Sequence, residues 1–159
     1  MGLRLKNQEY GNCFFVTTSF KNRRPLGNIK GVYEALAKAL NYRVLKTKSK
    51  LIAYVFMPSH IHLLLIIDGK TLSNFMRDFK KYTAQKSLSG LCGTRSVWQS
   101  RYDRQAIWNY DLLETKLEYI HNNPVKAGLV NMPDKWYYSS AGDYIGRTDN
   151  PIMVWKDWY

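Results

Sequence analysis

The hydrophobic positions of the chain fall partly in short runs and partly at a spacing of three and four residues, which predicts a mixture of strands and helices. The segment 13–20, CFFVTTSF, is rich in aromatic and β-branched residues and predicts a strand. Apolar positions then recur at helical spacing from about 30 to 47, which predicts an amphipathic helix. Two more strands are predicted at 51–57 and 60–67, and the short Pro-Ser turn between them favours antiparallel pairing.

The second half of the chain continues with a helix and a strand. Thr71 or Ser73 can cap a helix that places its apolar residues on one face and runs to about Leu88. The final AIW of the segment 96–108 predicts a fourth strand. The order βαββαβ is that of a ferredoxin-like fold, a four-stranded antiparallel sheet with helices on one face. We therefore expect an α+β fold.

A further helix and an aromatic tail follow the fourth strand. Asp111 can cap this helix, which should end before Pro124, because proline disfavours the helical conformation of the residue before it. The tail, 136–159, combines aromatic with turn-forming residues. Since neither an internal repeat nor a low-complexity linker interrupts the sequence, we expect residues 1–159 to form one domain.

Composition excludes several classes of protein. Apolar runs fall well short of the roughly 20 residues that a membrane helix needs, and residues 1–12 lack the apolar segment of a secretory signal. Cys13 and Cys92 are far apart and lack the spacing of a zinc site or a disulfide framework. We expect a cytoplasmic protein without a membrane partner, associated with the nucleoid if it binds DNA.

The net charge narrows the choice of partner. Lys and Arg number 24 against 12 Asp and Glu, which leaves a charge of +12 with histidine neutral. Such an excess favours a polyanionic partner such as nucleic acid. Charge alone leaves a simply basic protein as an equal alternative, so the choice depends on the candidate site residues.

Two of the three histidines lie two positions apart within a hydrophobic run, YVFMPSHIHLLLII. On a strand, His60 and His62 project from the same face, whereas Ile61 points to the other face. Two neighbouring imidazoles provide half of a metal site. For this pattern alone, two partly buried histidines hydrogen-bonded to their neighbours are the more common interpretation.

Two residues of the last predicted helix could complete such a site. Tyr119 and Asn123 are four residues apart and share a helix face. A helix packed on the sheet could present the Asn123 amide oxygen to a metal, with the Tyr119 phenol beside it. A core tyrosine and a helix-terminal asparagine before a proline are equally common, so the pattern leaves both interpretations open.

Longer stretches of the sequence resemble one family. YVFMPSHIHLLL resembles the HUH motif (histidine, hydrophobic, histidine) of single-tyrosine transposases, and EYIHNNPVKAGLV resembles the helix that carries their nucleophile. VWQSRYDRQAIW and WYYSSAGDYIG are similar to segments of the REP-associated tyrosine transposases. The resemblance extends in matching order from about Phe14 to Gly146.

The resemblance implies roles for individual residues. It implies that His60, His62 and Asn123 bind a divalent metal, Mg²⁺ or Mn²⁺, and that Tyr119 is the nucleophile. Mobile-element members commonly have glutamine where this chain has Asn123, so asparagine fits the domesticated relatives better. His121, about 200° around the helix from Tyr119, should face elsewhere.

The same resemblance implies a reaction and a substrate. The tyrosine would attack single-stranded DNA beside a hairpin and a guide tetranucleotide, leave a 5′-phosphotyrosine and a free 3′-hydroxyl, and reverse the step to transfer the strand. Glu114 and Glu118 are candidate bases only through their proximity to Tyr119 in the sequence. The protein could act as a monomer or as a homodimer.

Basic residues interleaved with aromatic ones independently favour a DNA partner. Phosphates would contact the cations, and exposed bases would stack on the rings. The candidate residues are Arg77, Lys80, Lys81, Lys86, Trp98, Arg101, Tyr102 and Arg104. The alternative for any one of them is a solvated helix face or a core aromatic.

Two other functions remain as alternatives. A non-catalytic module could bind a nucleic-acid hairpin with a tyrosine that has lost its role, but such a module needs neither the histidine pair nor Tyr119. A small metal-binding structural protein would leave the charge of +12 and the match at Tyr119 unexplained.

Overall fold

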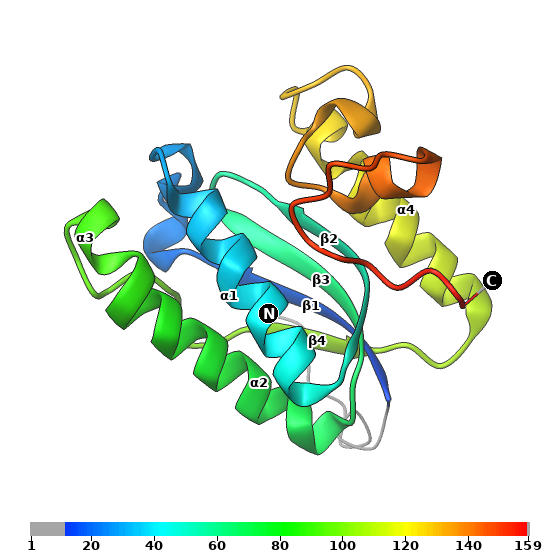
Figure 1. The fold of residues 1–159 in the computed structure, drawn as a ribbon, viewed down its shortest axis with the longest axis horizontal. Coiled ribbons are helices and arrows are strands. Elements are labelled where there is room, and N and C mark those ends of the chain that lie inside the picture. Colours follow the sequence, from blue (N-terminus) through cyan, green and yellow to red (C-terminus); the bar gives the residue numbers. More distant parts are fainter. Residues whose placement is uncertain (1–11, 159) are drawn as a thin grey trace.

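The computed structural model describes residues 12–158, and in it helices pack against both faces of a four-stranded antiparallel sheet (Figure 1). The longer elements are β1 (Cys13–Ser19), α1 (Val32–Thr47), β2 (Lys50–Phe56), β3 (His60–Ile66), α2 (Gly69–Tyr82), β4 (Asp103–Ala106) and α4 (Tyr110–Lys126). The short helical segments are η2 (Lys21–Arg23), η3 (Leu26–Asn28), η4 (Thr83–Ser87), α3 (Ser89–Cys92), η5 (Pro133–Lys135) and η6 (Ser140–Ile145).

The strands are ordered β2-β3-β1-β4, and each neighbouring pair is antiparallel. β3 therefore lies between β1 and β2, the two strands that α1 connects, which is a split βαβ arrangement. The α+β fold and the antiparallel sheet that the sequence predicts are confirmed. In register, Thr17 of β1 is opposite His62 of β3 on one side and opposite Asp103 of β4 on the other.

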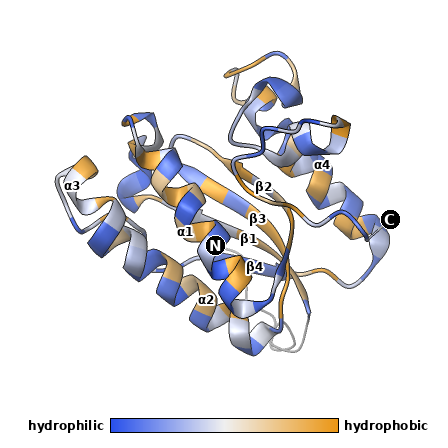
Figure 2. Cartoon of the chain, in the orientation of Figure 1, coloured by the Kyte–Doolittle hydropathy of each residue, from blue (hydrophilic) through white to orange (hydrophobic). Residues whose placement is uncertain are grey.

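One face of the sheet is covered by α1 and α2, and it carries the larger hydrophobic cluster. Phe14 of β1 and Leu63 of β3 pack here with Leu40 of α1 and Phe75 of α2, and all four side chains are buried. Figure 2 shows hydrophobic residues along these strands. Because removing each such side chain from water contributes about 1.5–3 kcal/mol, this cluster supplies much of the stability of the fold.

α4 packs on the opposite face, against β2 and β3 (Figure 1). Ile120 of α4 is fully buried in a second, smaller cluster that includes Val55 of β2 and Leu64 of β3. Leu113 and Leu117 of α4 are half-buried against the same cluster. One helix cannot cover the whole face, so polar side chains of β1, β3 and β4 border an open groove beside it.

Two predicted helix caps differ from the structure. α2 begins at Gly69 after Asp68, so Thr71 and Ser73 lie inside its first turns instead of capping it. α4 is capped by Asn109, whose side-chain oxygen accepts a hydrogen bond from the Leu112 amide at 2.8 Å. Asp111 lies in the first turn, where its negative charge still suits the positive end of the helix dipole.

The fourth strand lies earlier in the chain than the expected AIW. It spans Asp103–Ala106, so the predicted segment begins only at its last residue. Arg104 and Ala106 are buried on the side of α1 and α2, whereas Asp103 and Gln105 alternate to the other face. Polar residues at an edge strand concealed this strand from a pattern based on hydrophobicity.

Two helix ends also differ from the expectations. Pro124 does not end α4, which continues to Lys126 and is closed by hydrogen bonds to the Asn123 and Pro124 carbonyls. The proline removes the one hydrogen bond that its own amide would donate to the Ile120 carbonyl, while the amides of Ala127 and Leu129 still bond back to the helix. α2 ends at Tyr82 rather than near Leu88, and the chain continues directly into the wider turn of η4.

Candidate active site

The two histidines of β3 face the open groove beside α4, which we call the histidine groove. It is a hollow of about 630 Å³. It is lined by Phe15, Thr17, Arg23, His60, His62, Asp103, Lys116, Tyr119, Asn123, Lys126 and Ala127. The groove therefore brings together all four residues predicted to act in metal binding and catalysis.

Each histidine ring is held by a hydroxyl at Nδ1. Thr17 Oγ1 lies 2.8 Å from His62 Nδ1, and Ser59 Oγ lies 3.0 Å from His60 Nδ1. The two ring centroids are 4.8 Å apart. If each Nδ1 carries the proton and donates it to its hydroxyl, each Nε2 keeps a free lone pair, which is the tautomer that a metal ligand needs.

The environment also favours the uncharged form of both rings. Burial, with a smaller contribution from Arg23, lowers the pKa of His60 to about 4. Burial together with the neighbouring His60, Lys116 and Arg23 lowers the pKa of His62 to about 3. Both imidazoles are therefore neutral near pH 7, and neutral imidazole is the form that binds a metal.

Tyr119 and Asn123 reach the histidines from α4. Asn123 Nδ2 lies 3.5 Å from His62 Nε2, and Asn123 partly offsets the lowering of the pKa of His60. The Tyr119 ring meets the His62 ring edge to face at 5.4 Å and the Phe15 ring at 5.8 Å. Tyr119 is 42% exposed, so it is not a core tyrosine, and its side chain borders solvent beside the histidine pair.

α4 is held to the sheet on the side away from the groove, where His121 was expected to lie. His121 Nε2 lies 2.8 Å from Ser140 Oγ, and the Ser140 hydroxyl in turn bonds the backbone of Tyr54 in β2. Burial lowers the pKa of His121 to about 4, so this contact is made by a neutral ring. His121 therefore points away from the groove and holds the helix that carries Tyr119.

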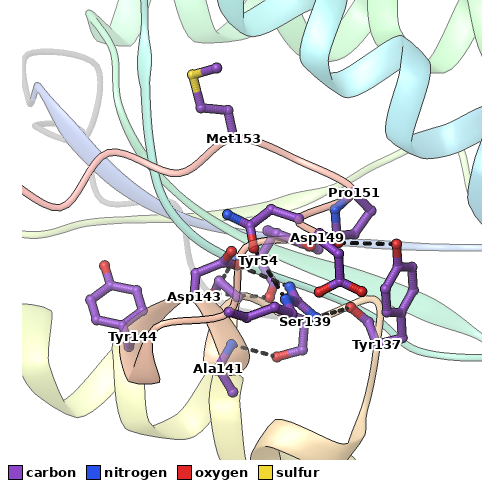
Figure 3. A network of polar contacts seen from close by, with 12 residues as sticks. Tyr54, Tyr137, Ser139, Ala141, Asp143, Tyr144, Asp149, Pro151 and Met153 are labelled. Carbon is purple, nitrogen blue, oxygen red and sulfur yellow. Dashed lines mark hydrogen bonds and ion pairs between the residues drawn. The ribbon is translucent and has the colours of Figure 1, made fainter.

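The segment after η5 forms a polar network against the outer edge of β2 (Figure 3). Arg147 donates to Asp143 Oδ2 at 3.1 Å and to the carbonyl oxygens of Ser139 and Tyr137. The Tyr144 hydroxyl donates to the carbonyl oxygen of Ile52 in β2 at 2.7 Å. Asp143 is almost fully buried, and burial outweighs Arg147 in raising its pKa. This network supports α4 on the side that faces away from the histidine groove.

The eight predicted DNA-contacting residues do not form one surface. Arg77, Lys81 and Lys86 are exposed on α2 and η4, on the sheet face opposite the histidines. Lys80 donates to the carbonyl oxygen of Gln99 at 2.6 Å and thereby fastens the 99–100 loop. These cations could meet only DNA that extends beyond the groove.

Trp98 and Arg104 require a correction. The Trp98 ring is 9% exposed, stacks on Phe20 at 4.6 Å and donates to Thr83 Oγ1 at 2.8 Å. The Arg104 guanidinium lies over the Phe14 ring and donates to the carbonyl oxygen of Gly69. Both side chains belong to the core on the α1 and α2 side, and neither is available to stack on a base or bind a phosphate.

Arg101 and Tyr102 lie closer to the candidate site. They border a second hollow, the loop hollow, lined by Thr17, Ser19, Arg23, Gln99, Ser100, Arg101, Tyr102 and Asp103. Three of these residues, Thr17, Arg23 and Asp103, also line the histidine groove. The two hollows therefore adjoin along the β1 and β4 strands.

Sequence reasoning missed several groove residues. Lys116 Nζ lies 4.7 Å from the Phe15 ring centre and 5.8 Å from that of Tyr119. Its spacing of three residues before Tyr119 was a signal that it shares the same helix face. Glu114 and Glu118 do not line the groove, and the acidic residue that does is Asp103.

Comparison with known families identifies the group to which this arrangement belongs. Residues 12–123 match the sequence model of the IS200-like transposases, a stretch that contains the whole sheet, both histidines, Tyr119 and Asn123. This chain belongs to the IS200-like transposase family. The matched region ends at Asn123, so the residues of Figure 3 from Tyr137 to Met153 lie outside it.

Individual relatives of this IS200-like transposase are consistent with that assignment. The REP-associated tyrosine transposase of Escherichia coli K12 is 27% identical over 154 residues, which cover 93% of this chain and 85% of that protein. The solved structure of a REP-associated tyrosine transposase bound to a REP hairpin matches with a TM-score of 0.76 and 26% identity, over 100% of this chain and 94% of the other. A putative transposase of Deinococcus radiodurans, 19% identical with a TM-score of 0.52 over 77% of this chain and 95% of the other, shares the fold.

The histidine groove holds a pair of imidazoles and one amide that could serve as ligands of a divalent cation. Within residues 12–158, no three side chains of His, Cys, Asp or Glu gather closely enough to hold a metal ion. A cation at the histidine pair would therefore need a donor of another type, and Asn123 is the side chain that lies beside them.

Within the same residues, no helix is long and apolar enough to span a membrane.

Proposed function

We propose that this transposase is a metal-dependent single-stranded DNA transesterase that cuts and rejoins DNA beside hairpins through a tyrosine–DNA intermediate. The observation that carries the proposal is the seating of a half-exposed tyrosine, Tyr119, against the His62 ring within one groove. The relative that was solved with a REP hairpin supports hairpin DNA as the substrate, as does the charge of +12.

His60, His62 and Asn123 would hold the metal through two ring nitrogens and an amide oxygen, with the Asn123 amide turned so that its oxygen faces the ion. When bound there, a divalent ion withdraws charge from the phosphate that is attacked. Two nitrogen donors suit Mn²⁺ better than Mg²⁺, which prefers an all-oxygen shell. If the hydroxyls of Thr17 and Ser59 accept the Nδ1 protons, the lone pair of each Nε2 is available for this role.

The reaction breaks one bond for each bond it forms. The Tyr119 oxygen attacks the phosphorus and loses its proton to the solvent of the open groove, the P–O3′ bond breaks, and the departing 3′-oxygen takes up a proton. The product is a 5′-phosphotyrosine and a free 3′-hydroxyl. Because the new link is still a phosphodiester, a 3′-hydroxyl can reverse the step without ATP.

The test is a denaturing-gel assay with end-labelled single-stranded oligonucleotides drawn from hairpins that flank the gene, in Mn²⁺, Mg²⁺ or EDTA. We expect a slow-migrating covalent adduct that requires metal and is lost in Tyr119→Phe. Hairpin affinity should stay within about fivefold, since one hydroxyl contributes roughly 1 kcal/mol.

Tyr110→Phe is the matched control for that test. Tyr110 lies on the same helix and is similarly exposed, but its ring contacts Trp158 and does not line the groove. It should leave adduct formation unchanged. If wild-type protein shifts the hairpin on a native gel but forms no adduct under any of these conditions, the protein is a binding module and the catalytic proposal fails.

A further inference from the structure

Arg23 lies in a backbone turn whose uncommon conformation is held by hydrogen bonds to another loop. Asn22 and Arg23 have φ angles of 55° and 51°, in the left-handed region that few residues other than glycine adopt. The neighbouring backbone is fastened to another loop, because the Lys21 amide donates to the Val97 carbonyl oxygen at 2.8 Å and the Asn22 amide to Gln99 Oε1 at 3.2 Å. A strained conformation that its surroundings enforce is a common feature of ligand-binding sites.

This turn directs Arg23 toward the candidate site, whereas the next arginine is engaged elsewhere. Arg23 is exposed and lines both the histidine groove and the loop hollow. Arg24 instead donates to the carbonyl oxygens of Lys21 and Ser96 and supports the turn.

The charges around the groove match a phosphate. Arg23, Lys116 and Lys126 supply cations, whereas Asp103 is the acidic residue of the lining. Lys116 lies over the Phe15 and Tyr119 rings, on the α4 side. Arg23 follows β1 and therefore belongs to the sheet side of the same groove. A DNA strand that runs from the histidine groove into the loop hollow must pass Arg23.

We propose that Arg23 binds the non-bridging oxygens of the scissile phosphate, opposite Tyr119, an assignment that rests on the proposed function. The planar guanidinium can donate two parallel N–H bonds to these oxygens. Arg23 neither gains nor loses a bond or a proton in the step. It stabilises the negative charge that spreads over these oxygens when Tyr119 attacks, and it acts equally in the reverse reaction.

The test compares single-turnover cleavage by wild-type protein, Arg23→Asn and Arg23→Lys, with saturating protein and the hairpin oligonucleotides of the adduct assay. Asparagine removes the guanidinium but tolerates the left-handed backbone, so the turn should survive. We expect Arg23→Asn to slow adduct formation by about 100-fold, as the loss of a charge-stabilising donor typically does. Arg23→Lys should recover part of this loss, because lysine restores the charge but cannot donate two parallel N–H bonds to the phosphate.

Arg95→Ala is the matched control, because Arg95 is an exposed arginine that lines neither the histidine groove nor the loop hollow. We expect it to leave the saturated rate within about threefold of wild type. Calorimetric titration of Mn²⁺ into Arg23→Asn should give wild-type affinity, which separates phosphate binding from damage to the metal site.

Two results would overturn the assignment of Arg23. One is a saturated rate for Arg23→Asn within about threefold of wild type, and the other is an equal loss of rate in Arg95→Ala. Either result leaves the proposed function intact, provided that wild-type protein forms the adduct. An absence of adduct with wild-type protein overturns both proposals together.

Discussion

The two faces of the central sheet use the same strands for opposite purposes. On the face toward α1 and α2, Leu63 of β3 is fully buried in a continuous hydrophobic cluster. On the other face, His60 and His62 of the same strand border a groove that α4 covers only in part. Alternation along one strand therefore separates the residues that stabilise the fold from those that meet a ligand.

The difference teaches how a polar site can be placed without weakening the core. His62 is 4% exposed, yet its Nδ1 has the Thr17 hydroxyl as a partner and its ring packs on Phe15 and Tyr119. Such a group costs little when it is buried neutral and hydrogen-bonded. Because the hydrophobic face supplies most of the stability, the groove face can hold polar side chains that bind a ligand or react with it.

The largest effect should follow from removing both histidines. We expect His60→Ala with His62→Ala to reduce metal-dependent adduct formation by about 100-fold to 10,000-fold, since metal charge stabilisation contributes several kcal/mol. The melting temperature should fall by only several degrees, because the lost hydrogen bonds to Thr17 and Ser59 are worth about 1 kcal/mol each. Adduct yield and thermal denaturation by circular dichroism check the two parts. A collapsed melting transition would instead mean that the histidines are structural.

A substitution on the face toward α1 and α2 should reduce stability and leave activity unchanged. Leu63→Ala should lower the free energy of unfolding by about 2–5 kcal/mol, because it leaves a cavity among fully buried side chains. Adduct formation per folded molecule should stay at the wild-type level at low temperature, since Leu63 points away from the groove. Urea denaturation and the adduct assay measure the two quantities on the same preparation. Reduced activity with wild-type stability would contradict the separation of the faces.

Much of the fold could be predicted from the sequence because local patterns determine it. Aromatic and β-branched composition located β1, and short apolar runs located β2 and β3, each to within about a residue, and helical spacing located α1. β4 was misplaced because its outward residues, Asp103 and Gln105, are polar at a sheet edge. Pro124 was given too much weight, since a proline in the last turn of a helix removes little hydrogen bonding.

The site could be predicted only where its residues follow a local period. His60 with His62 and Tyr119 with Asn123 share a strand face and a helix face, and the structure brings the two pairs into one groove. Arg23 carries no such signal, because its direction depends on a left-handed turn fastened to a loop more than 70 residues later. Trp98 was misassigned because an aromatic residue beside cations has the same pattern in a core as on a surface.

The smallest effect, and the sharpest comparison of the faces, comes from two adjacent threonines of β1. Thr17 Oγ1 contacts His62 Nδ1 in the groove, whereas Thr18 is buried on the other face, where its hydroxyl has no partner among the described residues. Thr17→Val should weaken Mn²⁺ binding about 10-fold to 100-fold, because His62 loses the bond that sets its tautomer. Thr18→Val should leave Mn²⁺ affinity unchanged and unfolding free energy equal or higher, since it removes an unsatisfied polar group. Calorimetric titration of Mn²⁺ and urea denaturation distinguish the two, and equal Mn²⁺ affinities would show that Thr17 does not orient the ligand.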